Sequence, residues 1–190
     1  MKQTIILAWL LLGSLYFLAA QPTTRLYHLR LRTLEGEAFP VQQWQAHRYT
    51  VLFFLSPECP LCQNYSRTIA QLRTRYPGQD LAFYGIFPGT HYDSDEIRAY
   101  LDTYSPPVIP LRDPAYHVTR ALGAQVTPEA FLLDATGQVL YSGKIDNWIP
   151  KLGQKRSVIT EYYLQDAIGA ALAGRPVPLR HIPAIGCFIE

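Results

Sequence analysis

An apolar run that leads straight into two cysteines is the feature that most constrains how this chain folds. Residues 49–55 are almost all aromatic, β-branched or aliphatic, which is typical of a strand buried on both faces of a parallel or mixed sheet. A short Ser-Pro-Glu turn follows. Residues 62–76 then place apolar side chains at spacings of three and four until Pro77-Gly78 ends the pattern. A buried strand followed at once by a helix indicates an α/β fold.

The rest of the chain repeats this alternation and continues through a hairpin to a last helix. Glu35-Gly36-Glu37 forms a turn, so residues 38–41 are expected to pair back on the first strand. Thr136-Gly137 joins two later strands in the same way. We expect strands at 26–32, 49–55 and 81–87, a short strand at 108–109, a hairpin over 129–143, and helices that begin at Asp93, Tyr116 and Ser157. These elements predict a central mixed β-sheet flanked by helices, with an N-terminal β-hairpin and a C-terminal extension.

Size and composition agree with a single globular domain. The chain has 190 residues, of which 48% are hydrophobic and 17% are charged, whereas a disordered chain is less hydrophobic and more charged. The formal net charge is +2, which is too balanced for the clustered basic face of a nucleic-acid-binding protein. We therefore expect no nucleic-acid partner.

The N-terminus has the three parts of a secretory signal peptide. Lys2 supplies a positive charge, residues 5–20 are almost wholly apolar, and Ala19-Ala20 provides small residues at the end. An uncleaved membrane anchor is the alternative interpretation. We divide the chain into a signal peptide or anchor at 1–20, a domain at 21–174 and a proline-rich tail at 175–190 that carries Cys187. Either way the protein is expected outside the cytoplasm, in the periplasm or extracellular space, where disulfides persist. Membrane contact is expected only if the first segment remains.

The two cysteines stand where the buried strand ends and the helix begins. Cys59-Pro60-Leu61-Cys62 is therefore expected in the first turn, where unpaired N–H groups and the helix dipole stabilise a thiolate. Pro60 suits this turn because its missing N–H is not needed there. Two cysteines at this spacing can close a reversible disulfide, with Cys59 as the exposed nucleophile and Cys62 as the shielded resolving thiol.

The segment over residues 51–62 resembles the active-site strand and CxxC helix of the thioredoxin superfamily. Residues 126–134 resemble the second signature of that superfamily, a Thr before a cis-proline that opens the next strand. The long gap between Cys59 and Pro128 holds an extra strand and helix at 81–110. That gap resembles the redoxin branch, which includes TlpA/ResA-like and AhpC/TSA proteins.

This resemblance implies a thioredoxin-like fold and an exported thiol–disulfide oxidoreductase. It assigns catalysis to Cys59 and Cys62, with a disulfide between these two residues in the oxidised state. It places Thr127 and a cis Pro128 beside them, where the preceding backbone forms an edge that binds a substrate chain. Because the two sulfurs carry the electrons, no cofactor and no metal are expected. The implied partners are protein thiols and disulfides and an upstream electron donor or acceptor.

Other functions stay open at this point. A peroxidase of the AhpC/TSA type would use Ser56 three residues before the reactive cysteine and a guanidinium from Arg112 or Arg120, but Leu52 stands where that group has proline. A Sco-like copper protein would use the two thiolates with a downstream histidine such as His117. A structural disulfide or half a zinc site is the remaining alternative, and zinc would need two further ligands.

Cys187 near the C-terminus is the unpaired member of the three cysteines. A leftover cysteine in an exported protein indicates a reactive thiol, an intermolecular bridge or a metal ligand. The alternative is a small buried residue that pins the tail by packing. The apolar neighbours Ile185, Phe188 and Ile189 favour the packing role.

Overall fold

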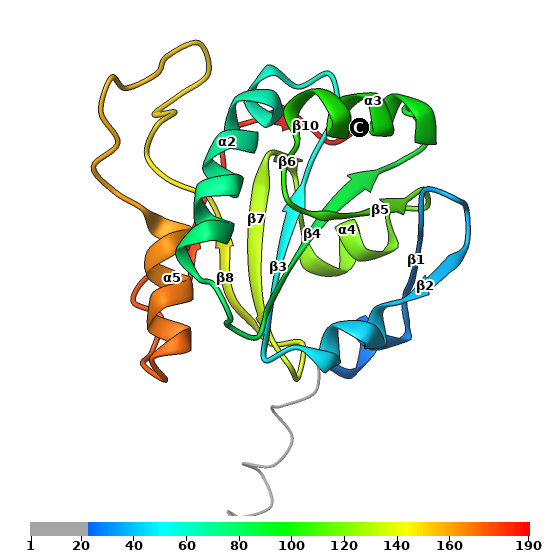
Figure 1. Ribbon diagram of the computed structural model, residues 1–190, viewed down its shortest axis with the longest axis horizontal. Helices are drawn as coiled ribbons and strands as arrows, with labels where there is room; N and C mark the ends of the chain where they lie inside the picture. The colour runs from blue at the N-terminus through cyan, green and yellow to red at the C-terminus, as the bar shows by residue number, and fades with distance from the viewer. Residues whose placement is uncertain (1–22) are drawn as a thin grey trace, which may run out of the picture.

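A computed structural model describes residues 23–190, and the signal segment expected at 1–20 lies outside them. Its centre is an eight-stranded mixed sheet in the order β2-β1-β5-β4-β3-β7-β8-β9, with helices on both faces (Figure 1). The strands of this sheet are β1 (Arg30–Arg32), β2 (Ala38–Pro40), β3 (Tyr49–Phe54), β4 (Leu81–Pro88), β5 (Ile109–Asp113), β7 (Glu129–Asp134), β8 (Val139–Gly143) and β9 (His181–Ile182). A separate two-stranded sheet joins β6 (Val126–Thr127) to β10 (Cys187–Phe188). The expected mixed sheet and N-terminal hairpin are confirmed.

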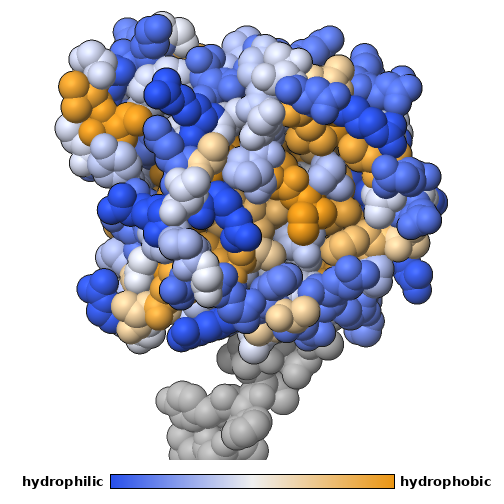
Figure 2. Space-filling model, in the orientation of Figure 1, coloured by the Kyte–Doolittle hydropathy of each residue, from blue (hydrophilic) through white to orange (hydrophobic). Residues whose placement is uncertain are grey.

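Two apolar clusters fill the space between the sheet and its helices. One face is covered by α2 (Pro60–Arg75), α3 (Ser94–Tyr104) and α5 (Tyr163–Leu172), and the other by η1 (Thr23–His28), η2 (Val41–Ala46) and α4 (His117–Leu122). Ile69 and Ile97 belong to the first cluster, and Trp44 and Val118 to the second. Figure 2 shows hydrophilic residues over much of the viewed face, with hydrophobic residues gathered in the hollows between them. In the part of the chain that is described, no helix is long and apolar enough to cross a membrane.

Strand β3 lies near the middle of the sheet and is buried on both faces. Val51 and Phe53 pack into the cluster beneath α2, while Leu52 and Phe54 pack into the opposite cluster. The strand pairs in parallel with β4 and antiparallel with β7. Burial of each such side chain contributes about 1.5–3 kcal/mol, so the strand is a rigid support for the turn that follows it.

The first expected strand is shorter than the sequence pattern predicts. Residues 23–28 form a 3-10 helix, and only Arg30–Arg32 join the sheet. Consecutive residues Leu26 and Tyr27 are both buried in one cluster, which a strand cannot achieve because its side chains alternate between faces. The Tyr27 hydroxyl also donates a hydrogen bond to the Ala135 carbonyl oxygen at 3.0 Å. Tertiary packing therefore overrides the local alternation.

The last helix begins later than expected, at Tyr163 and not at Ser157. The Asn147 side chain explains the difference, because its amide oxygen accepts the Thr160 N–H at 3.0 Å. The Asn147 backbone N–H donates to the Glu161 carbonyl oxygen at 3.1 Å. These long-range bonds hold the chain before Tyr163 in a non-helical path.

The tail returns to the body of the protein in two steps. It first adds β9 in parallel to β8, with the Lys144 N–H donating to the Ile182 carbonyl oxygen at 3.0 Å. It then pairs β10 antiparallel with β6. In Figure 1 the C-terminus is drawn in the same half of the molecule as β10 and β6. The sequence patterns did not predict either strand of the tail.

Candidate active site

The candidate site is built on the junction between β3 and α2. The Leu55 N–H donates to the Ile86 carbonyl oxygen at 2.9 Å and extends the sheet by one residue. Cys59 is the N-cap residue of α2, and Pro60 is its first helical residue. Cys62 therefore lies in the first turn, one turn from Cys59. This is the placement that stabilises a thiolate on the first cysteine of the pair.

Cys62 is a fully buried free thiol. Burial raises its pKa to about 12, because the thiolate would lose its hydration. The Ser56 backbone N–H donates to the Cys62 sulfur at 3.4 Å and lowers the pKa in part. In this state Cys62 is protonated and shielded, as a resolving thiol is expected to be.

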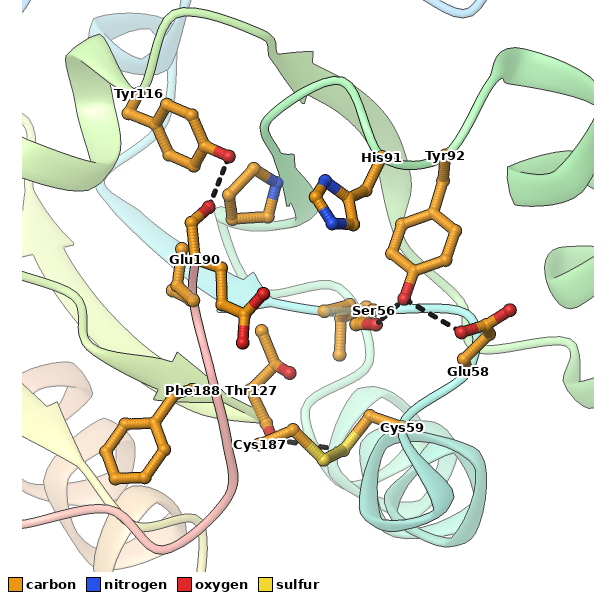
Figure 3. Close-up of a pocket in the computed structure, with 13 residues that line it drawn as sticks. Ser56, Glu58, Cys59, His91, Tyr92, Tyr116, Thr127, Cys187, Phe188 and Glu190 are labelled. Carbon is orange, nitrogen blue, oxygen red and sulfur yellow. Dashed lines mark hydrogen bonds between the residues drawn. A yellow bond between two sulfur atoms is a disulfide. The ribbon is translucent and has the colours of Figure 1, made fainter.

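Cys59 is disulfide-bonded to Cys187, with their Cα atoms 6.3 Å apart. The expected disulfide between Cys59 and Cys62 is therefore not the one present. Cys59 is also only 3% exposed, whereas we expected an exposed nucleophile, and Cys187 is bridged where we expected simple packing. The physical reason is the pairing of β10 with β6, which sets Cys187 opposite Thr127 and beside Cys59 (Figure 3).

The peptide bond between Thr127 and Pro128 is cis, as predicted. Thr127 is buried, and its carbonyl oxygen lies 3.2 Å from the Cys59 sulfur. The structure thus brings Cys59, Cys62 and the Thr127-Pro128 bond into one place. The role of Thr127 and Pro128 in binding a substrate stays a prediction.

Glu129 is a site residue that our sequence reasoning missed. It is 5% exposed, directly after Pro128, and its carboxylate accepts the Gln125 N–H at 2.8 Å and the Val126 N–H at 3.4 Å. These bonds hold the backbone of β6 in its bend. A charged residue at the start of the otherwise apolar run over 129–133 was the available signal, because a buried carboxylate needs hydrogen-bond donors.

An open cavity of about 390 Å³ lies beside the disulfide, lined on one side by Cys59 and Cys187. On the other side the Ser56 hydroxyl donates to the Tyr92 hydroxyl oxygen at 3.2 Å, and Tyr92 donates to the Glu58 carboxylate at 3.4 Å. Figure 3 shows these side chains facing the space next to the disulfide. Polar and aromatic side chains therefore face the two sulfurs across the cavity, on the side away from α2.

Of the residues named for the alternative functions, Ser56 lines this cavity, whereas Arg112, Arg120 and His117 do not. Arg112 donates to the Tyr92 carbonyl oxygen at 3.1 Å, and Arg120 lies over the Tyr116 ring, so neither supplies a guanidinium to the Cys59 sulfur. His117 is likewise absent from the lining. Within residues 23–190 no three His, Cys, Asp or Glu side chains are grouped as a metal site would require.

The central sheet, the helix that begins at a cysteine and the neighbouring cis proline together define a thioredoxin-like protein. The model of the AhpC/TSA family matches residues 23–142, and the chain therefore belongs to that family. The matched region includes Cys59, Cys62 and Pro128, and it ends before the tail that carries Cys187.

Solved structures agree with this assignment. A hypothetical protein from Sinorhizobium meliloti 1021 is 26% identical with a TM-score of 0.73, covering 85% of this chain and 89% of that one. An uncharacterized conserved protein from Geobacillus kaustophilus is 24% identical with a TM-score of 0.74, covering 85% and 87%. A secreted Mycobacterium tuberculosis disulfide oxidoreductase homologous to E. coli DsbE is 19% identical with a TM-score of 0.56, covering 79% and 98%, and it shows the fold alone. The search of curated proteins finds no match.

Proposed function

We propose that the protein is an exported thiol–disulfide oxidoreductase in which Cys59 is the nucleophile and Cys62 the resolving thiol. The observation that carries the proposal is the position of Cys59 at the start of α2, already joined to another cysteine through a disulfide beside Thr127. A sulfur in this position can form a mixed disulfide. A buried thiol one turn later can break it.

The reaction follows from the order of these groups. The Cys59 thiolate, stabilised by the N-terminus of α2, attacks one sulfur of a substrate disulfide and forms a mixed disulfide. The other substrate sulfur leaves as a thiolate and takes up a proton. Cys62 then loses its proton, attacks Cys59 and forms the Cys59–Cys62 disulfide, which releases the reduced substrate. The reverse sequence oxidises a dithiol, and an electron donor or acceptor resets the enzyme.

The signal peptide predicted at residues 1–20 is the basis for the proposed cellular location. If residues 1–20 direct export, the domain works in the periplasm or extracellular space, where substrate proteins carry disulfides. Its partners are then exported proteins with thiols or disulfides, and a redox protein that exchanges electrons with the Cys59–Cys62 pair.

The test is reduction of insulin by the mature protein with a dithiol as the electron donor. We expect Cys59→Ser to lower the rate to that of the dithiol alone, because the substituted hydroxyl cannot form a disulfide. Val158→Ser is the control, since Val158 is 66% exposed in the loop before α5. Full activity in Cys59→Ser would overturn the assignment of the nucleophile.

A further inference from the structure

We propose that residues 186–189 are an intramolecular substrate, in which β10 occupies the edge of β6 where a substrate polypeptide docks and Cys187 is a third redox cysteine. The inference rests on the proposed function and names the kind of substrate that this site takes. It adds a step in which Cys62 frees the tail from Cys59.

The backbone pairing is the first observation. Cys187 pairs with Thr127 and Phe188 with Val126 in an antiparallel register, and the Ile189 N–H donates to the Gln125 carbonyl oxygen at 3.0 Å. Within the described residues, β10 is the only strand paired with β6. An extended peptide that adds to a free strand edge in this way is a recurring form of peptide recognition.

Close approach at Gly186 is the second observation. A Cβ atom on Gly186 would lie 2.2 Å from the Thr127 carbonyl oxygen, so a side chain there would force the two strands apart. Glycine immediately before the cysteine therefore lets Cys187 reach the sulfur of Cys59. The site thus favours a substrate with glycine before its cysteine.

The remaining side chains of the tail define further preferences. Ile189 packs against the second apolar cluster, and the Tyr116 hydroxyl donates to the backbone carbonyl oxygen of Glu190. Phe188, in contrast, is 77% exposed. The site therefore selects an extended segment by its backbone, by an aliphatic residue two positions after the cysteine, and with little regard to the residue between them.

The Cys59–Cys187 bridge blocks access of a substrate to Cys59. The tail covers Cys59, which is 3% exposed, and occupies the docking edge at the same time. A second polypeptide cannot pair with β6 until β10 leaves. The bridged protein is therefore a closed form of the oxidised enzyme.

The closed form opens by thiol–disulfide exchange. Cys62 gives up its proton and its sulfur attacks the Cys59 sulfur, so the Cys59–Cys62 bond forms and the Cys59–Cys187 bond breaks. Cys187 leaves as a thiolate and takes up a proton, so no net oxidation or reduction occurs. A substrate thiol then attacks Cys59 in the place that Cys187 has left.

Peptide mapping of the oxidised full-length mature chain tests the third redox cysteine. We expect the Cys59–Cys187 bridge in the wild type and as the sole bridge in Cys62→Ser, and a Cys59–Cys62 bridge in Cys187→Ala. Absence of the Cys59–Cys187 bridge from both the wild type and Cys62→Ser would overturn the inference. Insulin reduction that depends on Cys59 would still stand in that case, so the two proposals can fail separately.

A peptide supplied in trans tests the substrate class. The protein is the full-length mature variant Cys62→Ser/Gly186→Ala/Cys187→Ala, whose own tail cannot form a bridge and docks more weakly, with Cys59 loaded as a mixed disulfide with an aromatic thiol. A peptide of residues 183–190 displaces that thiol, and its rate is compared with peptides carrying Gly186→Ala or Phe188→Ala. We expect the first change to slow the reaction about tenfold through lost backbone pairing and the second to leave it within about twofold. Equal rates for the unchanged and Gly186→Ala peptides would contradict recognition by strand pairing.

Discussion

At the scale of single residues, a buried ionisable pair links α2 to the loop after β8. The Tyr65 hydroxyl donates to the Asp146 carboxylate at 2.7 Å, and the Trp148 N–H donates to the same oxygen at 2.8 Å. Burial raises the pKa of Asp146 above its ordinary value. The folded protein therefore holds this proton to a higher pH than the unfolded chain does, and the free energy of unfolding falls as pH rises through that interval.

Tyr65→Phe removes a donor that stabilises the ionised carboxylate. We expect it to lower the free energy of unfolding by about 1–3 kcal/mol at neutral pH. The loss should be smaller below a pH of about 3, where Asp146 is largely protonated in the unfolded chain as well as in the folded protein. Urea unfolding at both pH values measures this, with Tyr104→Phe, at an exposed tyrosine, as the control. An equal loss at both pH values would show that Asp146 does not mediate the effect.

At the scale of elements, buried strands and capped helices could be predicted, and the tail could not. The run over 49–55 predicted β3 because it is apolar at nearly every position, and in the structure residues 50–55 are buried while Tyr49 is half-buried. The start of the helix at Asp93 was predicted from its acidic residues, which favour a helix N-terminus. In the structure Asp93 and Glu96 form a complete capping box. Strands β9 and β10 contain two residues each and depend on distant partners. Segments this short show no alternation of apolar and polar residues from which a strand could be predicted.

The helix cap gives a prediction for α3. Asp93 accepts the Asp95 and Glu96 N–H groups at 2.9 Å each, so Asp93→Ala should lower the free energy of unfolding by about 1 kcal/mol. Asp102→Ala, at an exposed position near the other end of α3, should change it by less than about 0.5 kcal/mol. Thermal or urea unfolding compares the two variants, and equal effects would rule out a stabilising cap.

The attachment of β9 depends on a glycine in β8. Gly143 has a φ of +119°, and a Cβ there would lie against the Ile182 carbonyl oxygen. Gly153 has a φ of +75° with nothing within 4 Å, so it controls for backbone strain alone. We expect Gly143→Ala to cost roughly 1–3 kcal/mol more than Gly153→Ala in urea unfolding. Equal losses would mean that close packing of β9 does not stabilise the fold.

At the scale of the whole molecule, the return of the tail to β6 determines which cysteine pairs with Cys59. That pairing is the part of the site that could not be predicted from the sequence. The junction at Cys59 and Cys62 is a local signature in the sequence, and the cis bond before Pro128 was expected from the resemblance to the thioredoxin superfamily. The partner of Cys59 was not, because three cysteines allow several pairings and only the return of the chain to β6 selects Cys187.

Trapping of the first mixed disulfide tests whether Cys59 is the sulfur that attacks the substrate and Cys62 the one that resolves. The reduced mature Cys62→Ser/Cys187→Ala variant has Cys59 as its remaining cysteine, and Cys59→Ser/Cys187→Ala has only Cys62. Each is mixed with oxidised insulin and mapped by mass spectrometry after alkylation of free thiols. We expect an insulin adduct on Cys59 in the first variant and almost none on the buried Cys62 in the second. An adduct that forms equally fast on Cys62 would contradict the proposed order of attack and resolution.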